Sequence, residues 1–386
     1  MQRLDVVGGW WFSLYDGHGG WQAAQFAAKN LHHFLAIELG NRLGVGHEEN
    51  DMLGSPDESP GGVFEGKVKE RMVVGALTQA FERTDRQYLS RVSGAFEVGF
   101  GRDTRAGACA IGALLVDGTL YVANLGDSRA VLGVAKDAFA SLPASERRDP
   151  HFAGEATEFL RRAAKVKSLE RVDAHQSAML DAPAPSGFLA VELSRDHNCR
   201  EERERAKLVE SHPDEPDVVV CRRPDACYIK GKLQPTRSFG DFYLKYSEFM
   251  RSQNAHASAG RYIHPPYTPP YITATPEVTV TRLRPGIDEF LVLGTDGLWD
   301  FMTSQEAIDL AGQVLRGSAS GDDAGTPEQA CVALRKEVLS RAAARAGLQF
   351  DELEMLPQGR ERRRRHDDVS IIVLDLRRAN EFFWWG

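Results

Sequence analysis

The order of the apolar patterns predicts an α+β fold: a four-layer α-β-β-α sandwich of two antiparallel sheets flanked by helices. Two helical stripes come first, along residues 24–39 and 68–88. A block of strand-like runs follows them, and helical patterns return toward the end of the chain. Because helices and sheets must each bury an apolar face, this order favours two packed sheets with helices on their outer sides.

The strands are predicted from apolar runs that turn residues interrupt. The first run, 10–15, is aromatic and apolar, and it stops at the Asp-Gly-His-Gly-Gly sequence of 16–20. Asp117-Gly118 separates two later runs and is a strong hairpin signal. The run that follows the turn at Gly126-Asp127 is expected to pair next in the same order. The predicted strands after the first are 108–116, 119–124, 128–134, 188–193, 277–283, 290–294 and 369–376.

The remaining helices are predicted over 199–210, 304–315 and 327–346. Two segments interrupt the regular order. Residues 137–186 are charged, rich in alanine and irregular in their apolar pattern, and residues 317–326 are a Gly/Ser/Asp loop. We therefore expect a single domain over residues 1–386 that carries these two segments as insertions.

Composition excludes several classes of protein. Hydrophobic residues make up 42% and charged residues 26% of the 386 residues, which is an ordinary globular balance. The net charge of −8, from 47 basic and 55 acidic residues, argues against nucleic-acid binding. No run approaches the roughly 18 apolar residues of a membrane span. The five cysteines include no CxxC pair, which predicts neither a disulfide framework nor a zinc site, and which suits a reducing intracellular compartment.

Carboxylates recur at the predicted strand ends. Asp16 follows the first strand, Asp296 follows the strand 290–294, and Asp367 and Asp368 open the strand 369–376. Taken singly, each could be an ordinary turn or cap residue. Taken together, three strand tips that meet would bring like charges close, and such charges need a cation among them to stay ionised. Oxygen ligands favour Mg²⁺ or Mn²⁺ over zinc.

Seven short motifs, in order along the chain, resemble those of the protein phosphatase 2C family, the metal-dependent serine/threonine phosphatases. They include Asp-Gly-His-Gly-Gly at 16–20, Arg-Ser-Phe-Gly-Asp at 237–241 and Thr-Asp-Gly-Leu-Trp-Asp at 295–300. The motif stretches are 12–20, 107–110, 122–132, 193–198, 236–241, 290–300 and 366–373. From Leu193 onward the chain looks closest to the pyruvate dehydrogenase phosphatase group and a related plant group.

The resemblance implies two catalytic Mg²⁺ or Mn²⁺ ions and a third ion that is bound more weakly. Matched position by position, the protein ligands of the catalytic pair are Asp16, the carbonyl of Gly17, Asp296 and Asp367. The ligands of the third ion are Asp196, Asp296 and Asp300. Two cations about 3.5–4 Å apart can hold a bridging hydroxide in line with phosphorus, so the implied reaction is hydrolysis of phosphoserine and phosphothreonine in a phosphoprotein substrate.

His18 matches the histidine that protonates the leaving serine or threonine oxygen in this family. A group with an ordinary pKa of about 6.5 suits that task near neutral pH. The alternative is a residue that merely begins the following helix. No feature of the sequence indicates an oligomeric state.

The chain departs from the family pattern before Asp16. The family has an upstream arginine that grips phosphate and an acidic pair that supports the metals, and the fifteen residues here offer only Arg3 and Asp5. We therefore expect a domain that lacks its N-terminal strand. The alternative function is a catalytically impaired pseudophosphatase that acts by binding; another two-metal hydrolase would need histidine ligands. The expected location is intracellular, cytoplasmic or nuclear, or the mitochondrial matrix if a targeting segment is missing.

Overall fold

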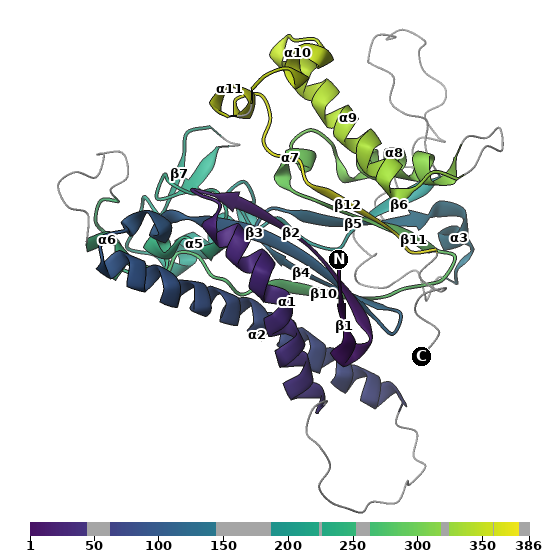
Figure 1. The fold of residues 1–386 in the computed structure, drawn as a ribbon, viewed down its shortest axis with the longest axis horizontal. Helices are drawn as coiled ribbons and strands as arrows, with labels where there is room; N and C mark the ends of the chain where they lie inside the picture. The colour runs from purple at the N-terminus through teal and green to yellow at the C-terminus, as the bar shows by residue number, and fades with distance from the viewer. Residues whose placement is uncertain are drawn as a thin grey trace, which may run out of the picture. The chain divides into compact units, whose positions relative to one another are not determined.

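A computed structural model describes residues 1–44, 62–143, 187–223, 226–251, 263–317, 324–357 and 359–377. The chain forms two compact units. Unit 1 comprises Met1–Ser128 and Ser194–Arg282, and unit 2 comprises Arg129–Leu193 and Leu283–Gly386. Each unit contains an antiparallel sheet with its own helices (Figure 1). The predicted α+β class with two antiparallel sheets is therefore confirmed.

The larger sheet, in unit 1, has the strand order β1-β2-β3-β4-β10, with β9 paired to β3. Its strands are β1 (Gln2–Leu4), β2 (Gly9–His18), β3 (Gly107–Val116), β4 (Thr119–Leu125), β9 (Phe239–Gly240) and β10 (Glu277–Arg282). The turn between β3 and β4 uses Asp117 at φ 49° and Gly118 at φ 68°. Two successive positive φ angles suit a tight hairpin, and the predicted hairpin is confirmed.

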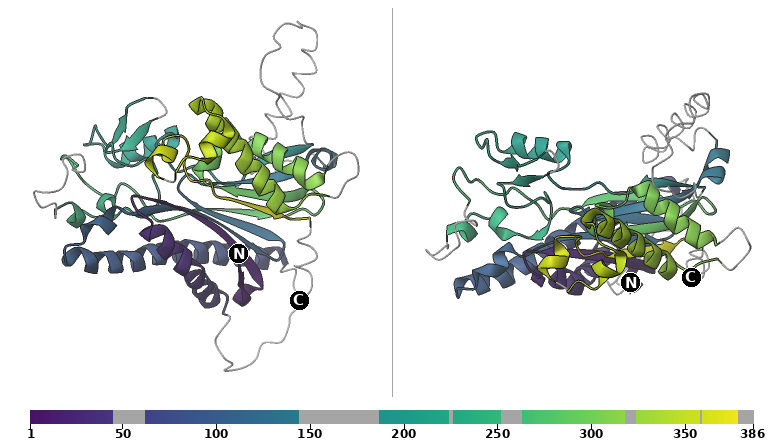
Figure 2. Two further views of the ribbon diagram at one scale, coloured as in Figure 1. Left: turned by 45° about the horizontal axis from the view of Figure 1, so that its top comes forward. Right: turned by 90° about the horizontal axis from the view of Figure 1, so that it is seen from above.

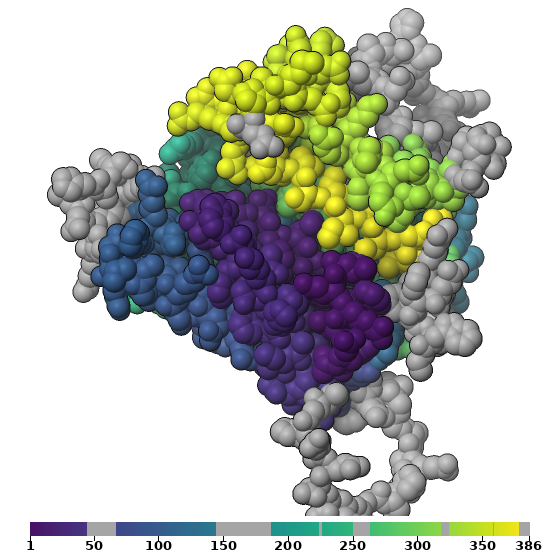
Figure 3. Space-filling view, in the orientation of Figure 1, coloured from purple at the N-terminus to yellow at the C-terminus, as the bar shows by residue number. Residues whose placement is uncertain are grey.

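Two long helices pack on this sheet. They are α1 (Gln22–Leu43) and α2 (Gly62–Glu97), which lie side by side in the ribbon views (Figures 1 and 2). Leu31 and Leu35 of α1, Phe81 of α2 and Trp11 of β2 are fully buried in one core. Other parts of α1 lie on the outer surface of unit 1 (Figure 3). The shorter elements are η1 (Asp5–Val7), η2 (Gly101–Arg105), α5 (Glu202–Ser211), β7 (Val219–Cys221), β8 (Cys227–Ile229), η4 (Phe242–Leu244) and α6 (Glu248–Arg251).

The sheet of unit 2 has the strand order β12-β11-β5-β6. Its strands are β5 (Arg129–Ala135), β6 (Phe188–Glu192), β11 (Asp288–Gly294) and β12 (Ile371–Asp375). Its helices are α3 (Lys136–Ser141), α7 (Asp296–Trp299), α8 (Ser304–Arg316), α9 (Pro327–Ala346), α10 (Phe350–Glu354) and α11 (Arg360–Arg363). Capping boxes at Thr303 and Thr326 begin α8 and α9, so both helices start at the predicted residues.

Three strand expectations are corrected. The strand after Gly126 does not pair with β4, because β3 and β10 occupy both edges of β4; it enters the other sheet between β11 and β6 instead. Strand β2 continues past Tyr15 to His18, because the small residues at the start of β3 keep pairing with it. Strand β12 begins at Ile371, so Asp367 and Asp368 precede it by a short loop.

One disulfide joins Cys221 to Cys227, which the scattered cysteines did not predict. The register of the β7–β8 hairpin sets these two residues opposite each other. The bulk of the predicted insertions, 144–186 and 318–323, lies outside the described residues. Within the described part of the chain, none of the helices combines the length and the apolar character needed to cross a membrane.

Candidate active site

Strand β2 carries three of the predicted site residues near its end. Asp16, Gly17 and His18 pair in register with Cys109, Ala108 and Gly107 of β3. Asp16 therefore lies inside the strand rather than at its tip, which corrects the expectation from sequence. This regular pairing fixes the backbone at Asp16, and with it the directions of the Asp16 and His18 side chains.

His18 forms an ion pair with Asp241, a residue far away in the sequence. Its Nε2 donates to Asp241 Oδ2 at 2.5 Å, and Ser238 Oγ donates to the same oxygen at 2.7 Å. The Asp241 side chain is only 1% exposed, whereas that of His18 is 28% exposed. Gly107 makes room for the pair, since a Cβ there would lie 1.9 Å from Asp241 Oδ2 and 2.3 Å from His18 Nε2.

Carboxylates control the charge of His18. Burial by itself would lower the pKa of the imidazole, but the charge and hydrogen bond of Asp241 oppose this, and the charges of Asp127 and Asp16 add to them. The net effect is a pKa above the ordinary value of 6.5. The side chain that is partly exposed at the end of β2 is therefore well able to hold a proton near neutral pH.

Two further aspartates of unit 1 lie close to each other. Burial raises the pKa of the Asp127 carboxyl, and the charge of Asp196 raises it further. Cys109 Sγ and Asn198 Nδ2 donate to Asp127 at 3.2 and 3.3 Å. The Cys109 pKa is raised by burial and then by Asp127, so its thiol stays protonated. The mutual repulsion of Asp127 and Asp196 is of the kind that a cation would relieve.

A buried ion pair from α2 positions the loop that carries Asp241. Asp85 accepts from the backbone N–H of Gly240 at 2.8 Å and from Lys245 Nζ at 2.7 Å. Lys245 also donates to the carbonyl oxygen of Ser238 at 2.8 Å. Asp241 itself has φ 49°, in the left-handed region where Asp is tolerated better than most residues. The contacts on both sides of Asp241 hold this uncommon backbone conformation in place.

In unit 2, the turn after β11 is tied to the segment before β12. Thr295 Oγ1 donates to the carbonyl oxygen of Asp368 at 3.2 Å and accepts from the N–H of Ser370 at 3.1 Å. The N–H of Thr295 donates to the carbonyl oxygen of Ser370 at 3.1 Å. These bonds bring the backbone at Asp296, the first residue of α7, next to the segment that follows Asp367.

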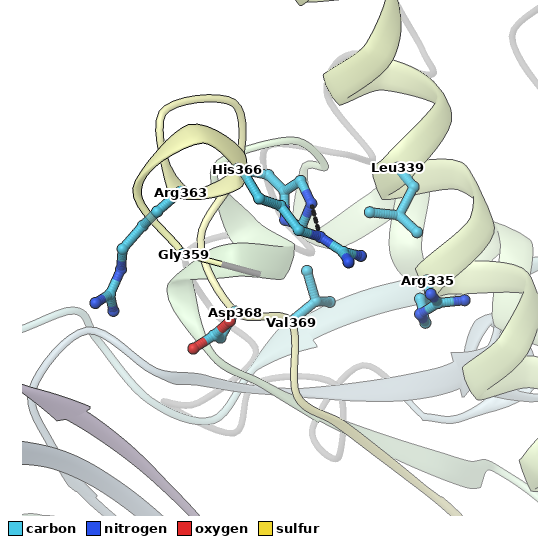
Figure 4. A pocket seen from close by; sticks show the side chains of 8 residues that line it. Arg335, Leu339, Gly359, Arg363, His366, Asp368 and Val369 are labelled. Atoms are coloured by element: carbon cyan, nitrogen blue, oxygen red, sulfur yellow. Dashed lines mark hydrogen bonds between the residues drawn. The ribbon is translucent and has the colours of Figure 1, made fainter. Parts of the chain in front are cut away.

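Asp367 lies beside an arginine-rich pocket. Its Oδ1 accepts from Arg363 at 3.2 Å and from the N–H of Asp368 at 2.8 Å. The pocket has a volume of about 550 Å³, and Arg335 of α9 lines the wall opposite Asp368 (Figure 4). His366 donates through Nδ1 to the carbonyl oxygen of Asp367, which leaves Nε2 to accept from Arg362 at 3.3 Å (Figure 4).

The predicted metal ligands are divided between the two units. Asp16, Gly17 and Asp196 belong to unit 1, whereas Asp296, Asp300 and Asp367 belong to unit 2. Across the residues that the structure describes, no three histidine, cysteine, aspartate or glutamate side chains are grouped so as to hold a metal ion. The donors are nevertheless all hard oxygens, which fit Mg²⁺ or Mn²⁺. The repulsion between Asp127 and Asp196 supports a cation near the ligands of unit 1.

Two residues of the site had been given no site role from sequence. The Arg-Ser-Phe-Gly-Asp motif was noted without a site role for Asp241, whose side chain contacts His18. Gly107 belongs to another noted motif, and its role is to leave space for this pair. His18 and Asp241 are 223 positions apart, and no spacing rule links residues at that separation. Only the fold therefore identifies them as partners.

Comparison with known proteins assigns the chain to a family. The protein phosphatase 2C family model matches residues 10–157 and 182–347. These ranges include Asp16, His18, Asp241 and Asp296, while Asp367 lies beyond them. "Probable protein phosphatase 2C 67" of Arabidopsis thaliana is 28% identical over 373 residues, which cover 96% of this chain and 75% of the relative. "Probable protein phosphatase 2C 28" of Oryza sativa subsp. japonica is also 28% identical, over 95% of this chain and 69% of the relative.

Solved structures agree on the fold. The serine-threonine phosphatase 2C from Toxoplasma gondii matches with a TM-score of 0.50 and 17% identity, over 96% of this chain and 86% of that one. A C. elegans sex determining protein matches with a TM-score of 0.50 and 14% identity, over 97% of this chain and 58% of that one. The narrower likeness to pyruvate dehydrogenase phosphatases stays a prediction. Since the family model matches most of the sequence, the chain belongs to the protein phosphatase 2C family, a family of protein phosphatases.

Proposed function

We propose that this protein is a metal-dependent phosphatase of phosphoserine and phosphothreonine in proteins, and that His18 is its general acid. The observation that carries the proposal is the His18–Asp241 pair on the strand that also bears Asp16. Membership of the phosphatase family and the raised pKa of His18 support the same role.

In the proposed reaction an oxygen of water bonds to phosphorus, and the bond between phosphorus and the serine or threonine oxygen breaks. The leaving alkoxide is a strong base and takes a proton from His18 Nδ1, because Nε2 donates to Asp241. The Asp241 carboxylate accepts from the imidazole, so it stabilises the protonated form of His18 and fixes the ring orientation before the transfer. We call Asp241 a positioning residue, because its role is exerted through His18.

We propose that Asp16, the Gly17 carbonyl, Asp296 and Asp367 hold two Mg²⁺ or Mn²⁺ ions. Asp196 and Asp300 would join Asp296 in holding a third, weaker ion. When bound, these cations supply charge neutralisation for the phosphoryl group and activation of water. Asp367 would have to exchange its Arg363 contact for a cation, which an exposed ion pair of modest strength permits.

The test is hydrolysis of a phosphothreonine peptide with and without Mn²⁺, for the wild type and two matched variants. Asp367→Asn should abolish Mn²⁺-dependent turnover and weaken the rise of Tm that Mn²⁺ produces. Asp368→Asn removes the same charge from the adjacent exposed residue and should keep both properties. Equal behaviour of the two variants would contradict the ligand assignment, and no turnover by the wild type would contradict the function.

A pseudophosphatase was the alternative expected from sequence. No contact among the described residues favours it. A protein that acted only by binding would have no need for a buried carboxylate that holds a proton on a partly exposed histidine.

A further inference from the structure

A recess in unit 1 adjoins the His18–Asp241 pair and is lined by three cationic side chains. Its volume is about 490 Å³, and the cations are Arg102, Arg105 and Lys232. The two arginines come from η2, whereas Lys232 follows β8. The chain as a whole has a net charge of −8, so such a concentration of positive charge is not a consequence of its composition.

Arg105 is anchored against the turn that follows His18. A Cβ on Gly19, which has φ +69°, would lie 2.2 Å from the carbonyl oxygen of Arg105, so the two backbones are in direct contact. The guanidinium lies over the ring of Tyr243, 4.9 Å from its centroid. A cation–π contact of this kind limits the directions that the side chain can take. Arg105 is thus held in place beside the general acid.

Lys232 lies in a tight turn whose backbone is held by hydrogen bonds and by a neighbouring ion pair. Its backbone N–H donates to the carbonyl oxygen of Ile229 at 2.8 Å. Two residues earlier, Lys230 is buried in an ion pair with Glu215 and donates to Asp217 at 2.7 Å. Lys232 is half-buried and Arg102 is exposed, so the recess has one cation at its mouth and others deeper inside.

The acidic residue of the lining does not cancel this charge. Asp241 is almost fully buried, and its Oδ2 already accepts from His18 and Ser238. The recess therefore presents mainly cations to what enters it. Its volume lies in the range of about 300–1,000 Å³ typical of ligand pockets, much more than one phosphoryl group fills.

We propose that this recess binds an acidic side chain that flanks the dephosphorylated residue, either a carboxylate or a second phosphoryl group. The inference rests on the proposed function, because His18 must reach the leaving oxygen of the target residue. Neighbouring residues of the same substrate then lie within reach of a recess that shares His18 in its lining. Arginine suits such anions because it can donate two parallel hydrogen bonds to them.

The proposal is tested with three phosphothreonine peptides that differ only in the flanking residues: alanine, glutamate or phosphoserine. For the wild type, kcat/KM should be about three- to tenfold higher with an acidic flank, which is the effect of one or two partly exposed ion pairs. The two acidic peptides show whether the recess takes carboxylates, phosphoryl groups or both. The preference should shrink as salt is added, because exposed charges are screened.

Two variants of the recess and one control variant on α2 separate the recess from the rest of the surface. The double variant Arg105→Gln/Lys232→Gln should lose the preference for acidic flanks, and Arg102→Glu, at an exposed position, should reverse it. Arg71→Gln removes an exposed arginine of α2 and should keep the wild-type preference. If the double variant lost kcat/KM equally with all three peptides, the proposal would be overturned, because the recess would then bind the reacting phosphoryl group itself.

A binding measurement keeps this proposal separate from the proposed function. Fluorescence anisotropy with a labelled peptide that carries glutamate flanks and a hydrolysis-resistant phosphonate needs no turnover. If the wild type binds this peptide and Arg102→Glu does not, the recess proposal stands even when no substrate is hydrolysed. Equal binding by both proteins would refute it, even if the enzyme is active.

Discussion

Asp241→Asn removes the charge that holds the proton on His18 while it leaves the side-chain volume almost unchanged. The contact is a charge-assisted hydrogen bond of 2.5 Å with a carboxylate that is 1% exposed. Hydrogen bonds to charged groups contribute about 1.5–3 kcal/mol. Because about 1.4 kcal/mol corresponds to a factor of ten in rate, kcat toward a phosphothreonine peptide should fall by about 10- to 100-fold.

The assay compares two leaving groups. Threonine alkoxide is a strong base and needs a proton, which His18 supplies in the proposed reaction, whereas the nitrophenolate of nitrophenyl phosphate departs without one. Asp241→Asn should therefore lose less than about threefold on nitrophenyl phosphate. His18→Gln should show the same selectivity with a larger loss on the peptide, about 10²- to 10⁴-fold.

The double variant provides the control for this reasoning. If Asp241 acts only through His18, then His18→Gln/Asp241→Asn should be no slower than His18→Gln alone, because residues that act as a unit are not additive. Losses of equal size on both substrates would show that Asp241 supports the fold or the metals instead. Full activity of Asp241→Asn toward the peptide would refute the role altogether.

Three other changes test the structure around the site. Gly107→Ala places a Cβ 1.9 Å from Asp241 Oδ2 and should lower both Tm and peptide turnover, whereas Gly94→Ala, in open space on α2, should keep both. Lys245→Met leaves a buried carboxylate without its cation and should cost about 3–5 kcal/mol in urea unfolding. The hydrogen bond from His197 is the main cause that lowers the pKa of Glu277 from 4.5 to about 2. The stabilisation that Glu277 contributes is therefore present above pH 4.5 and is lost as the pH falls toward 2. Glu277→Gln should lower the unfolding free energy by about 1–2 kcal/mol at neutral pH, after allowance for screening by solvent. At pH 2 the same substitution should leave the unfolding free energy unchanged.

Local signals in the sequence determine the elements but not their partners. Thr326 and Gly347 flank α9 with a capping box and a left-handed cap, so its bounds, Pro327–Ala346, could be predicted. The strand after Gly126 was assigned nearly correctly along the chain, yet its neighbours were wrong. Periodicity describes which face of a strand is apolar, and it carries no information on which sheet edge is still open.

In the candidate site, too, local features could be predicted from the sequence, whereas contacts between distant residues could not. Aspartates such as Asp16 could be proposed as metal ligands from short motifs, since each motif keeps its residues at fixed spacing. The partner of His18 could not be predicted in this way. Asp241 comes next to His18 only because β3 pairs with both β2 and β9. The recess was equally hidden, since Arg105 and Lys232 are far apart in sequence and neither belongs to a charged run.

The charge of His18, the proposed general acid, depends on Asp241, whose side chain is almost fully buried. Asp85 of α2 binds the N–H of Gly240 and the ammonium of Lys245, and these contacts hold Asp241 in its left-handed conformation. Burial raises the pKa of Asp85, although Lys245 opposes this shift, so the pair is kept in place at some cost in stability. A network of this kind is better explained by the geometry it imposes on Asp241 than by stability. Changes at Asp85 should therefore act on turnover through His18, and they should spare nitrophenyl phosphate as Asp241→Asn does.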